Sequence, residues 1–464
     1  MKLSSFLSHH KSRSFFLPAH SRGQALPNDL KELLRKRPGI WDIPEIPNFG
    51  GPLLNYGAVA ESQLACASEF GVERAWYGVN GATGLLQAAL LAIAEPGSAI
   101  LMPRNVHQSI IQGCVLADLK PILFGLPFLA DRCHFLPPDK KWLSKVLDEV
   151  SLKGIQIKGA LLVNPSYHGY AEDIVPLVNL LHERDLPVIV DEAHGFHFSI
   201  GAGELPNSGL KAGADLVVHS LHKSAPGLNQ TAVLWNQGNR VDPSLVERCI
   251  SLLQTTSPSS LLLASCESSL LEFHGPRGKR KLVASIEKAN KISQKLRNND
   301  LPLLATQDPF RLILHTSALG INGFDAYKWL ISKGIIAELP EPGTLTFCMG
   351  FAPDFSKANF LIREWNKLIN YGFDRESLQP FSAPSFPLIT EMKMPCFAAW
   401  RNESKEINIR DALGKIAAEI ICPYPPGIPI VIPGELLDAN HIAWILEQKS
   451  LWPEQIPSKI RIVS

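Results

Sequence analysis

The sequence predicts an α/β fold with a mainly parallel central sheet, followed by small α+β domains toward the C-terminus. Three observations predict it: short apolar segments alternate with helix-length segments, polar residues follow several apolar segments, and 464 residues exceed what one core normally holds. Such alternation is typical of a parallel sheet covered by helices. The predicted strands are residues 99–102, 121–124, 160–163, 188–190, 216–218 and 231–235, and the helices between them include 109–119, 139–150 and 175–184.

The chain is expected to contain more than one domain. Residues 1–50 are rich in proline, glycine and basic residues, which indicates an arm that lies on the rest of the protein. Helical apolar spacing then runs from Leu53 to Phe70, and a long basic helix over 279–297 leads to a second part. The predicted division is an arm (1–50), a major domain (51–298), a small α+β domain (299–371), a linker rich in proline and serine (372–395) and a C-terminal domain (396–464).

Composition excludes several classes of protein. The 45 basic and 44 acidic residues leave a net charge of +1, so nothing favours a nucleic acid or another polyanion as partner. No apolar run reaches the roughly 18 residues that a membrane helix needs, and charged residues interrupt any signal-peptide core. The eight cysteines show no Cys-x-x-Cys pair, which argues against a structural metal site and for free thiols in a reducing cytoplasm.

Polar side chains follow four of the predicted strands. The ligand crevice of an open parallel sheet lies outside the carboxyl ends of its strands, so these side chains are expected to converge. Arg104, Asn105 and His107 follow the first strand, Asn164 and Tyr167 the third, Asp191 and His194 the fourth, and Ser220, His222 and Lys223 the fifth.

A small-residue turn over Asn80–Gly84 precedes a predicted helix over 85–94. Backbone N–H groups and the positive dipole end at the start of such a helix can bind an anion. An ordinary helix start is the alternative. The turn matches neither the phosphate loop of nucleotide-binding proteins nor the dinucleotide-binding pattern, so a nucleotide-binding function is discounted.

Lys223 and Asp191 suggest a specific chemistry. A lysine in a partly dry pocket has a lowered pKa, because desolvation disfavours the ammonium, and it can then form a Schiff base. An aspartate at the end of an upstream strand can pair with a pyridinium nitrogen. Together the two residues are the arrangement that binds pyridoxal phosphate (PLP). Either residue by itself could equally be a solvated surface group.

Nine stretches together resemble the bacterial ornithine/lysine/arginine decarboxylase family, PLP enzymes with the aspartate-aminotransferase fold (fold type I). The resemblance covers nearly the whole chain and is closest to the short forms, which lack a receiver-like N-terminal domain. The family's Pro-Gly-His-Lys arm reads Pro18-Ala19-His20-Ser21 here, and its Asn-Pro-Thr-Tyr reads Asn164-Pro165-Ser166-Tyr167. The stretches are Pro18–Gly23, Asn80–Thr83, Arg104–Ser109, Asn164–Gly169, Asp191–Gly195, Ser220–Lys223, Thr256–Ser259, Tyr424–Pro429 and Pro433–Glu435.

The resemblance implies a role for each matched residue. Lys223 would hold PLP as a Schiff base, Asp191 would pair with the pyridine nitrogen, and His107 would stack on the ring with Ala193 on its other face. The catalytic residues would be Lys223, His107 and His222, the last as a possible proton carrier. The remaining cofactor contacts would be Gly81, Ala82, Thr83, Ser220 and His222 at the phosphate, His194 at the phenolic oxygen, and Ser166.

The resemblance also implies a homodimer or larger assembly, because Thr256–Ser259 match a segment that reaches a neighbouring subunit's site. A turn cap is the alternative for that segment.

The expected reaction is α-decarboxylation of arginine, lysine or ornithine through a quinonoid intermediate, in polyamine biosynthesis more than in acid resistance. An aminotransferase or another lyase on the same fold is one alternative, with Arg311 as a possible carboxylate clamp. A catalytically silent regulatory protein is the other. Glu338 and Glu435 are among the carboxylates that could read the cationic side chain of the substrate.

Overall fold

The computed structural model describes residues 3, 5, 7, 12–370, 376–424 and 426–464. Its centre is an eight-stranded sheet in the order β15-β4-β3-β7-β8-β9-β10-β2. Neighbours from β4 to β9 are parallel, whereas β10 is antiparallel to both of its neighbours and β15 to β4. The mainly parallel sheet predicted from the sequence is therefore confirmed. The strands are Arg74–Gly78 (β2), Ala99–Pro103 (β3), Lys120–Phe124 (β4), Ile157–Val163 (β7), Val188–Asp191 (β8), Leu216–Ser220 (β9), Ala232–Asn236 (β10) and Ile389–Thr390 (β15).

Helices cover both faces of this sheet. Alternate residues of β7 show the two faces: Leu161 packs in one buried cluster with α4, α5 and α10, whereas Ala160 and Leu162 pack in another that includes α6 and α7. Burial on both faces explains why the central strands are continuous apolar runs. The helices of this part are Ala58–Phe70 (α3), Gly81–Ile93 (α4), Gln108–Ala117 (α5), Lys140–Leu152 (α6), Val175–His182 (α7), Phe196–Ser199 (α8), Leu221–Ser224 (α9), Pro243–Leu253 (α10), Ser260–Leu271 (α11) and Gly275–Arg297 (α12).

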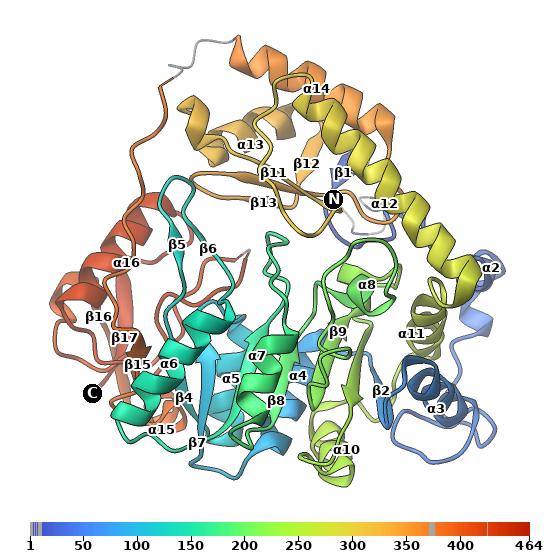
Figure 1. Ribbon diagram of the computed structural model, residues 1–464, viewed down its shortest axis with the longest axis horizontal. Helices are drawn as coiled ribbons and strands as arrows, with labels where there is room; N and C mark the ends of the chain where they lie inside the picture. Colours follow the sequence, from blue (N-terminus) through green and yellow to red (C-terminus); the bar gives the residue numbers. More distant parts are fainter. Residues whose placement is uncertain (1–2, 4, 6, 8–11, 371–375, 425) are drawn as a thin grey trace.

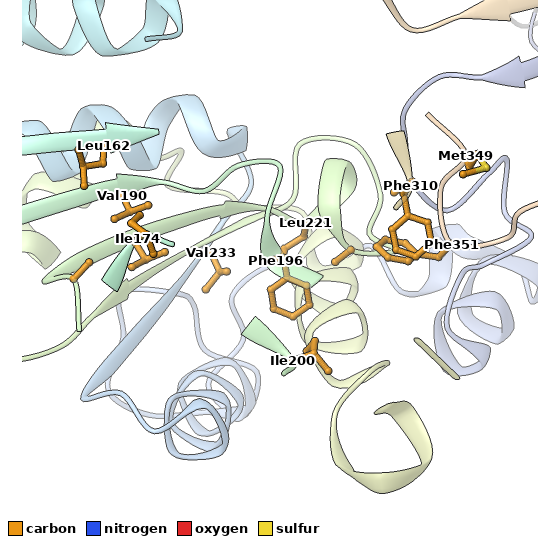
Figure 2. Packing of buried hydrophobic residues seen from close by; sticks show 14 of the residues in the cluster. Leu162, Ile174, Val190, Phe196, Ile200, Leu221, Val233, Phe310, Met349 and Phe351 are labelled. Carbon is orange, nitrogen blue, oxygen red and sulfur yellow. The ribbon is translucent and has the colours of Figure 1, made fainter. Parts of the chain in front are cut away.

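The long helix α12 leads to a smaller three-stranded sheet in the order β11-β14-β13 (Figure 1). The hydrophobic core continues between the two sheets. Figure 2 shows it running from Leu162 and Val190 past Phe196 to Phe310 and Phe351, whose ring centroids lie 4.9 Å apart. The elements here are Arg311–Leu314 (β11), Gly323–Ser332 (α13), Ile335–Ala337 (β12), Leu339–Pro340 (β13), Leu345–Cys348 (β14) and Phe355–Ile369 (α14).

The C-terminal residues form a separate cluster of buried side chains around Trp444 and Ile462. The elements are Cys396–Arg401 (α15), Ser404–Asn408 (β16), Ala439–Leu451 (α16) and Lys459–Val463 (β17), and β16 pairs with β17 in antiparallel orientation. The remaining short elements of the described chain are Arg13–Phe15 (β1), Asn28–Arg35 (α2), Phe128–Leu129 (β5), His134–Phe135 (β6), and 3-10 turns at Pro38–Ile40, Ser317–Leu319 and Ile409–Asp411.

The N-terminal arm lies against both sheets. Its strand β1 pairs in parallel with β12, and the two form a separate two-stranded sheet. The Ala19 N–H donates a hydrogen bond to the His222 carbonyl oxygen at 2.8 Å, and the Phe351 N–H donates to the Ala19 carbonyl oxygen at 2.9 Å. The arm therefore contacts the segment that carries Lys223.

Several boundaries differ from the sequence prediction. The helix predicted from Leu53 begins at Ala58, because Gly57 just before it has a φ of +87° and interrupts the helical backbone. The helix predicted from Leu85 begins at Gly81. Residues 389–390, inside the predicted linker, form the edge strand β15. The division into domains stays a prediction. Within the described residues, no helix has the length and apolar character needed to cross a bilayer.

Candidate active site

A cavity of about 290 Å³ lies where the parallel strands of the large sheet end. Its other walls come from three places: the turn between β13 and β14 of the small sheet, the β5–β6 hairpin, and the C-terminal segment. The structure brings every predicted site residue to this cavity: Gly81, Ala82, Thr83, His107, Ser166, Asp191, Ala193, His194, Ser220, His222 and Lys223 all line it. The other residues predicted to converge at the strand ends, Arg104, Asn105 and Tyr167, also line the cavity, whereas Asn164 does not.

Lys223 lies on the short helix α9, directly after β9. Its Nζ is 3.5 Å from Nε2 of His194. Burial lowers the pKa of the Lys223 ammonium, against the opposite effect of the Asp191 and Glu338 carboxylates. A lysine in this environment loses its proton more readily than one in water and is therefore a better nucleophile.

Asp191 ends β8 and is 5% exposed. Its Oδ1 accepts a hydrogen bond from the Ala193 N–H at 3.2 Å, which fixes the carboxylate at the cavity floor. Burial raises the pKa of Asp191, and the nearby Lys223 opposes that rise. A buried carboxylate of this kind is stabilised when a cationic group pairs with it.

His107 caps the N-terminus of α5. Its Nδ1 accepts a hydrogen bond from the Ser109 N–H at 3.2 Å, so the neutral ring carries its proton on Nε2. Burial and the nearby Lys223 lower the pKa of His107 to about 4. The backbone of Gly427 lies directly beside this ring: a Cβ on Gly427 would be 2.8 Å from His107 Nε2.

The start of α4 supplies an anion-binding backbone. Gly81, with φ of +66°, donates its own N–H to the Gln230 carbonyl oxygen at 2.8 Å. The N–H groups that follow in the first turn have no partner inside the helix and face the cavity end of the sheet. Ser220 and His222 also line the cavity, and Ser220 Oγ is 3.1 Å from His222 Nδ1. Burial lowers the pKa of His222 to about 4.

Arg311 is occupied by protein groups. Its Nη2 donates to His194 Nδ1 at 2.8 Å and its Nε to the Tyr167 carbonyl oxygen at 3.3 Å, and Asp308 lies 3.7 Å from Nη1. Because Nδ1 of His194 accepts, its Nε2 carries the proton that points toward Lys223. Arg311 thus orients His194 from behind the cavity wall.

Neither acidic residue singled out from the sequence lines this cavity. Glu435 is fully buried and forms an ion pair with Arg104 at 2.7 Å. Glu338 accepts hydrogen bonds from the Tyr167 hydroxyl and, at 2.8 Å, from the Leu17 N–H. It lines a smaller adjoining cavity of about 180 Å³, whose wall also includes Lys223, His107 and His222. In the described chain, the carboxylates on the main cavity wall are Asp191 and Glu341.

Sequence reasoning missed Glu341, its two histidine neighbours and the aromatic residues of the cavity. His168 lies in the matched stretch Asn164–Gly169 but was given no role there, and no spacing connects it with the others, since they come from segments far apart in the chain. They include His134, His168, Phe128, Phe135, Phe386, Trp444 and Trp452. Thr256 and Ser257, expected to reach a neighbouring subunit, are exposed and lie outside the cavity.

Sequence comparison identifies the family. The major domain of the Orn/Lys/Arg decarboxylases matches residues 2–315, and the C-terminal domain of the same family matches residues 388–457. The arginine decarboxylase of Bacillus anthracis is 30% identical over 95% of this chain and 91% of its own length. The chain belongs to the Orn/Lys/Arg decarboxylase family. It is accordingly a carboxy-lyase, and its cofactor is pyridoxal phosphate.

Structural comparison confirms the predicted fold. The constitutive lysine decarboxylase of Escherichia coli superposes with a TM-score of 0.75 at 19% identity, covering 100% of this chain and 81% of that one. Aspartate aminotransferase of Thermus thermophilus gives a TM-score of 0.52 at 15% identity, over 74% of this chain and 93% of that one. The Orn/Lys/Arg decarboxylase chain therefore has the aspartate-aminotransferase fold predicted from its sequence.

The residues around the cavity fit the cofactor of this family. An amine with a lowered pKa, a buried carboxylate that benefits from a cationic partner, a neutral histidine ring and a helix N-terminus line one cavity. These are the groups needed for an aldehyde, a pyridine nitrogen, an aromatic face and a phosphate, respectively.

Proposed function

We propose that this enzyme removes the α-carboxylate of a basic L-amino acid and that arginine is its preferred substrate. The observation that carries the proposal is one cavity that holds Lys223, Asp191 and His107 together with a second carboxylate, Glu341. The relatives support arginine, because proteins named arginine decarboxylase are 29–30% identical over at least 92% of the chain, whereas the lysine decarboxylases of Escherichia coli are 22–23% identical over 84%.

Bound PLP supplies the electron sink for the bond broken on loss of CO2. In the proposed mechanism, Lys223 Nζ would hold the cofactor covalently. Asp191 keeps a proton on the ring nitrogen, and the neutral ring of His107 covers one face and excludes water. His222, next to Lys223, would carry protons between the Lys223 amine and the reacting carbon of the substrate.

The part of the cavity wall that carries Glu341 suits a planar cation. Glu341 provides negative charge, and Phe135, Trp444 and Trp452 provide aromatic faces. A guanidinium stacks on such faces and is more weakly hydrated than an ammonium, so this wall favours arginine over lysine or ornithine.

The occupied Arg311 argues for decarboxylation over transamination. An aminotransferase on this fold needs an arginine free to clamp the α-carboxylate. Arg311 already contacts His194, Tyr167 and Asp308, and it does not line the cavity. The intact Lys223, Asp191 and His107 set also argues against a silent regulatory protein.

We further propose that the enzyme acts as a homodimer or larger assembly in a reducing cytoplasm. All eight cysteines are unpaired, which fits a reducing compartment. The exposed Thr256 and Ser257 fit a segment that completes a neighbouring site.

Product analysis tests the proposed function. Purified enzyme loaded with PLP is incubated separately with arginine, lysine and ornithine without a keto acid, and CO2 and the amine product are measured. Agmatine formation is expected to be the fastest. Borohydride should fix the cofactor on Lys223 in the native enzyme and in the exposed-lysine control Lys288→Ala, but not in Lys223→Ala. Dependence on a keto acid, or no borohydride labelling of the native enzyme, would contradict the proposal.

A further inference from the structure

Three buried side chains of the cavity wall meet in one cluster. His134 lies on β6, His168 follows β7, and Glu341 follows β13. β6, β7 and β13 belong to three different sheets. The β5–β6 hairpin projects from the large sheet toward β13 of the small one (Figure 1). His134, His168 and Glu341 are 1%, 6% and 6% exposed.

The ligand atoms of this cluster converge. Oε2 of Glu341 lies 2.6 Å from Nε2 of His168 and 3.2 Å from Nε2 of His134, and the ligand atoms of the three residues all fall within 4.8 Å of one another. Ligand atoms around a tetrahedral zinc ion are about 3.3 Å apart, given metal–ligand bonds of about 2.0–2.1 Å. To hold such an ion, the distance from Glu341 Oε2 to His168 Nε2 would lengthen by about 0.7 Å. The rings of His134 and His168, now stacked with centroids 3.8 Å apart, would turn so that both Nε2 lone pairs meet at the ion.

The surroundings of the cluster favour metal ligation. Nε2 of His134 lies 3.2 Å from Glu341 Oε2 and 2.9 Å from Thr344 Oγ1, and a neutral ring with its proton on Nδ1 offers the Nε2 lone pair to an ion at this place. Nδ1 of the same ring is 3.2 Å from the Tyr170 hydroxyl, a partner that can accept the remaining ring proton. A histidine ligand held by such a second contact is typical of protein zinc sites.

We propose that His134, His168 and Glu341 bind a divalent cation of the zinc class, with the fourth coordination position open toward the active-site cavity. Two imidazoles and one carboxylate with an open position are a ligand set that zinc takes in proteins. All three residues line the cavity, which places the open position on the substrate side.

This site has a consequence that rests on the proposed function. Glu341 is the carboxylate that we assign to the cationic end of the substrate. A metal ion bound to Glu341 neutralises it and places positive charge on the same wall, which repels a guanidinium. The metal and arginine should therefore compete, so that the metal raises the apparent KM for arginine and leaves kcat unchanged.

Direct titration tests the metal site without turnover. PLP-loaded enzyme, freed of metal by chelation, is titrated with ZnCl2 in a calorimeter, and bound zinc is counted by mass spectrometry after desalting. We expect about one zinc per chain, lost in His168→Ala and in the nearly isosteric Glu341→Gln. His274→Ala is the matched control, because the His274 ring pairs with Glu69 and belongs to neither the cluster nor the cavity lining. Cofactor absorbance and melting temperature report whether each variant is folded.

Tyr170→Phe provides a second, milder variant. Loss of the hydroxyl beside His134 Nδ1 should weaken zinc binding roughly 10-fold while the ligands stay in place. Absence of zinc binding in the native enzyme, or equal binding in His168→Ala and Glu341→Gln, would overturn the site. Binding without any effect on the KM for arginine would overturn the competition. If zinc binds as expected but no amino acid is decarboxylated, the proposed function fails and the metal site stands.

Discussion

At the residue scale, the cavity depends on places where the backbone approaches a functional side chain too closely for a Cβ. Gly427 is one such place. Its φ is +86°, and a Cβ there would lie 2.8 Å from His107 Nε2 and 2.9 Å from its Cδ2. The C-terminal segment thus braces the ring that we assign to the cofactor face, and only glycine fits the position.

Gly427→Ala should therefore displace His107. We expect kcat for arginine to fall roughly 10- to 100-fold, because a displacement near 1 Å at a reacting site has about that effect. Gly414→Ala is the control, since Gly414 has a similar φ of +75° and open space around its Cβ. Both variants carry the same backbone strain, about 1–2 kcal/mol. Equal losses of kcat in the two would show that strain, and not contact with His107, is responsible.

The buried histidines make the cofactor-free chain sensitive to acid. In the folded chain the pKa of both His107 and His222 is about 4, below the ordinary 6.5, mainly because of burial. Below pH 6.5 the unfolded chain binds protons that the folded chain does not, so the free energy of unfolding decreases as pH falls from 6.5 toward 4. The decrease should be roughly 2 kcal/mol for each ring by pH 5.

Urea unfolding of the cofactor-free protein at pH 7 and pH 5 measures this effect. His222→Gln should lose about half of the pH-dependent decrease attributed to the two rings, whereas the more exposed His274→Gln should retain all of it. An unchanged pH dependence in His222→Gln would contradict the assignment.

At the element scale, the sequence predicted the parts of the fold that have a strong local pattern. The central strands are continuous apolar runs because both faces are buried, so β3, β4, β7, β8 and β9 lie within a few residues of their predicted positions. The edge strands β2 and β15 were missed. β2 is as long as β3, but its sequence Arg-Ala-Trp-Tyr-Gly is not a continuous aliphatic run, and β15 has only two residues. β15 acquires its structure only by pairing with β4, a contact between residues far apart in the chain.

The same distinction applies to the site. Lys223, Asp191 and His107 were predictable because each follows a recognisable strand. His134, His168 and Glu341 were not, since a two-stranded hairpin, a loop and a turn bring them together only in the folded chain. Glu338 and Glu435 looked equally suitable in sequence, yet neither lines the main cavity, whereas Glu341 does.

Packing between the hairpin and the small-sheet turn should control Glu341. A Cβ on Gly343 would lie 2.8–2.9 Å from the backbone of Arg132, in the hairpin. Gly343→Ala should therefore push the two elements apart, lower the free energy of unfolding by about 1–3 kcal/mol and raise the KM for arginine. Gly39→Ala, at a glycine with open space around it, should change neither quantity. Urea unfolding measures the free energy of unfolding, and steady-state kinetics measure KM. A destabilised Gly343→Ala variant with native KM would show that Glu341 does not take part in substrate binding.

At the scale of the whole molecule, one surface region suggests how two chains meet. Apolar side chains within residues 40–56 are exposed, and Ser260, which follows the Thr256 segment, contacts this stretch. The Ser260 hydroxyl donates to the Trp41 carbonyl oxygen and accepts from the Ile43 N–H. Exposed apolar residues clustered in this way are typical of a protein interface. They are Ile40, Trp41, Ile43, Ile46, Leu54 and Tyr56.

Subunit mixing tests whether Thr256 completes a site on the partner. Lys223→Ala and Thr256→Trp should each be inactive as homodimers, the first at its own site and the second at its partner's. Random exchange gives heterodimers in which one site carries both defects and the other carries none. The mixture should therefore recover about a quarter of native activity, because half of the dimers are mixed and each holds one intact site. Mixing Lys223→Ala with Asp191→Asn is the control, since both residues serve the site of their own chain and no intact site can form. Full activity of Thr256→Trp alone, or no recovery in a mixture shown to contain heterodimers, would place the Thr256 segment outside the active site.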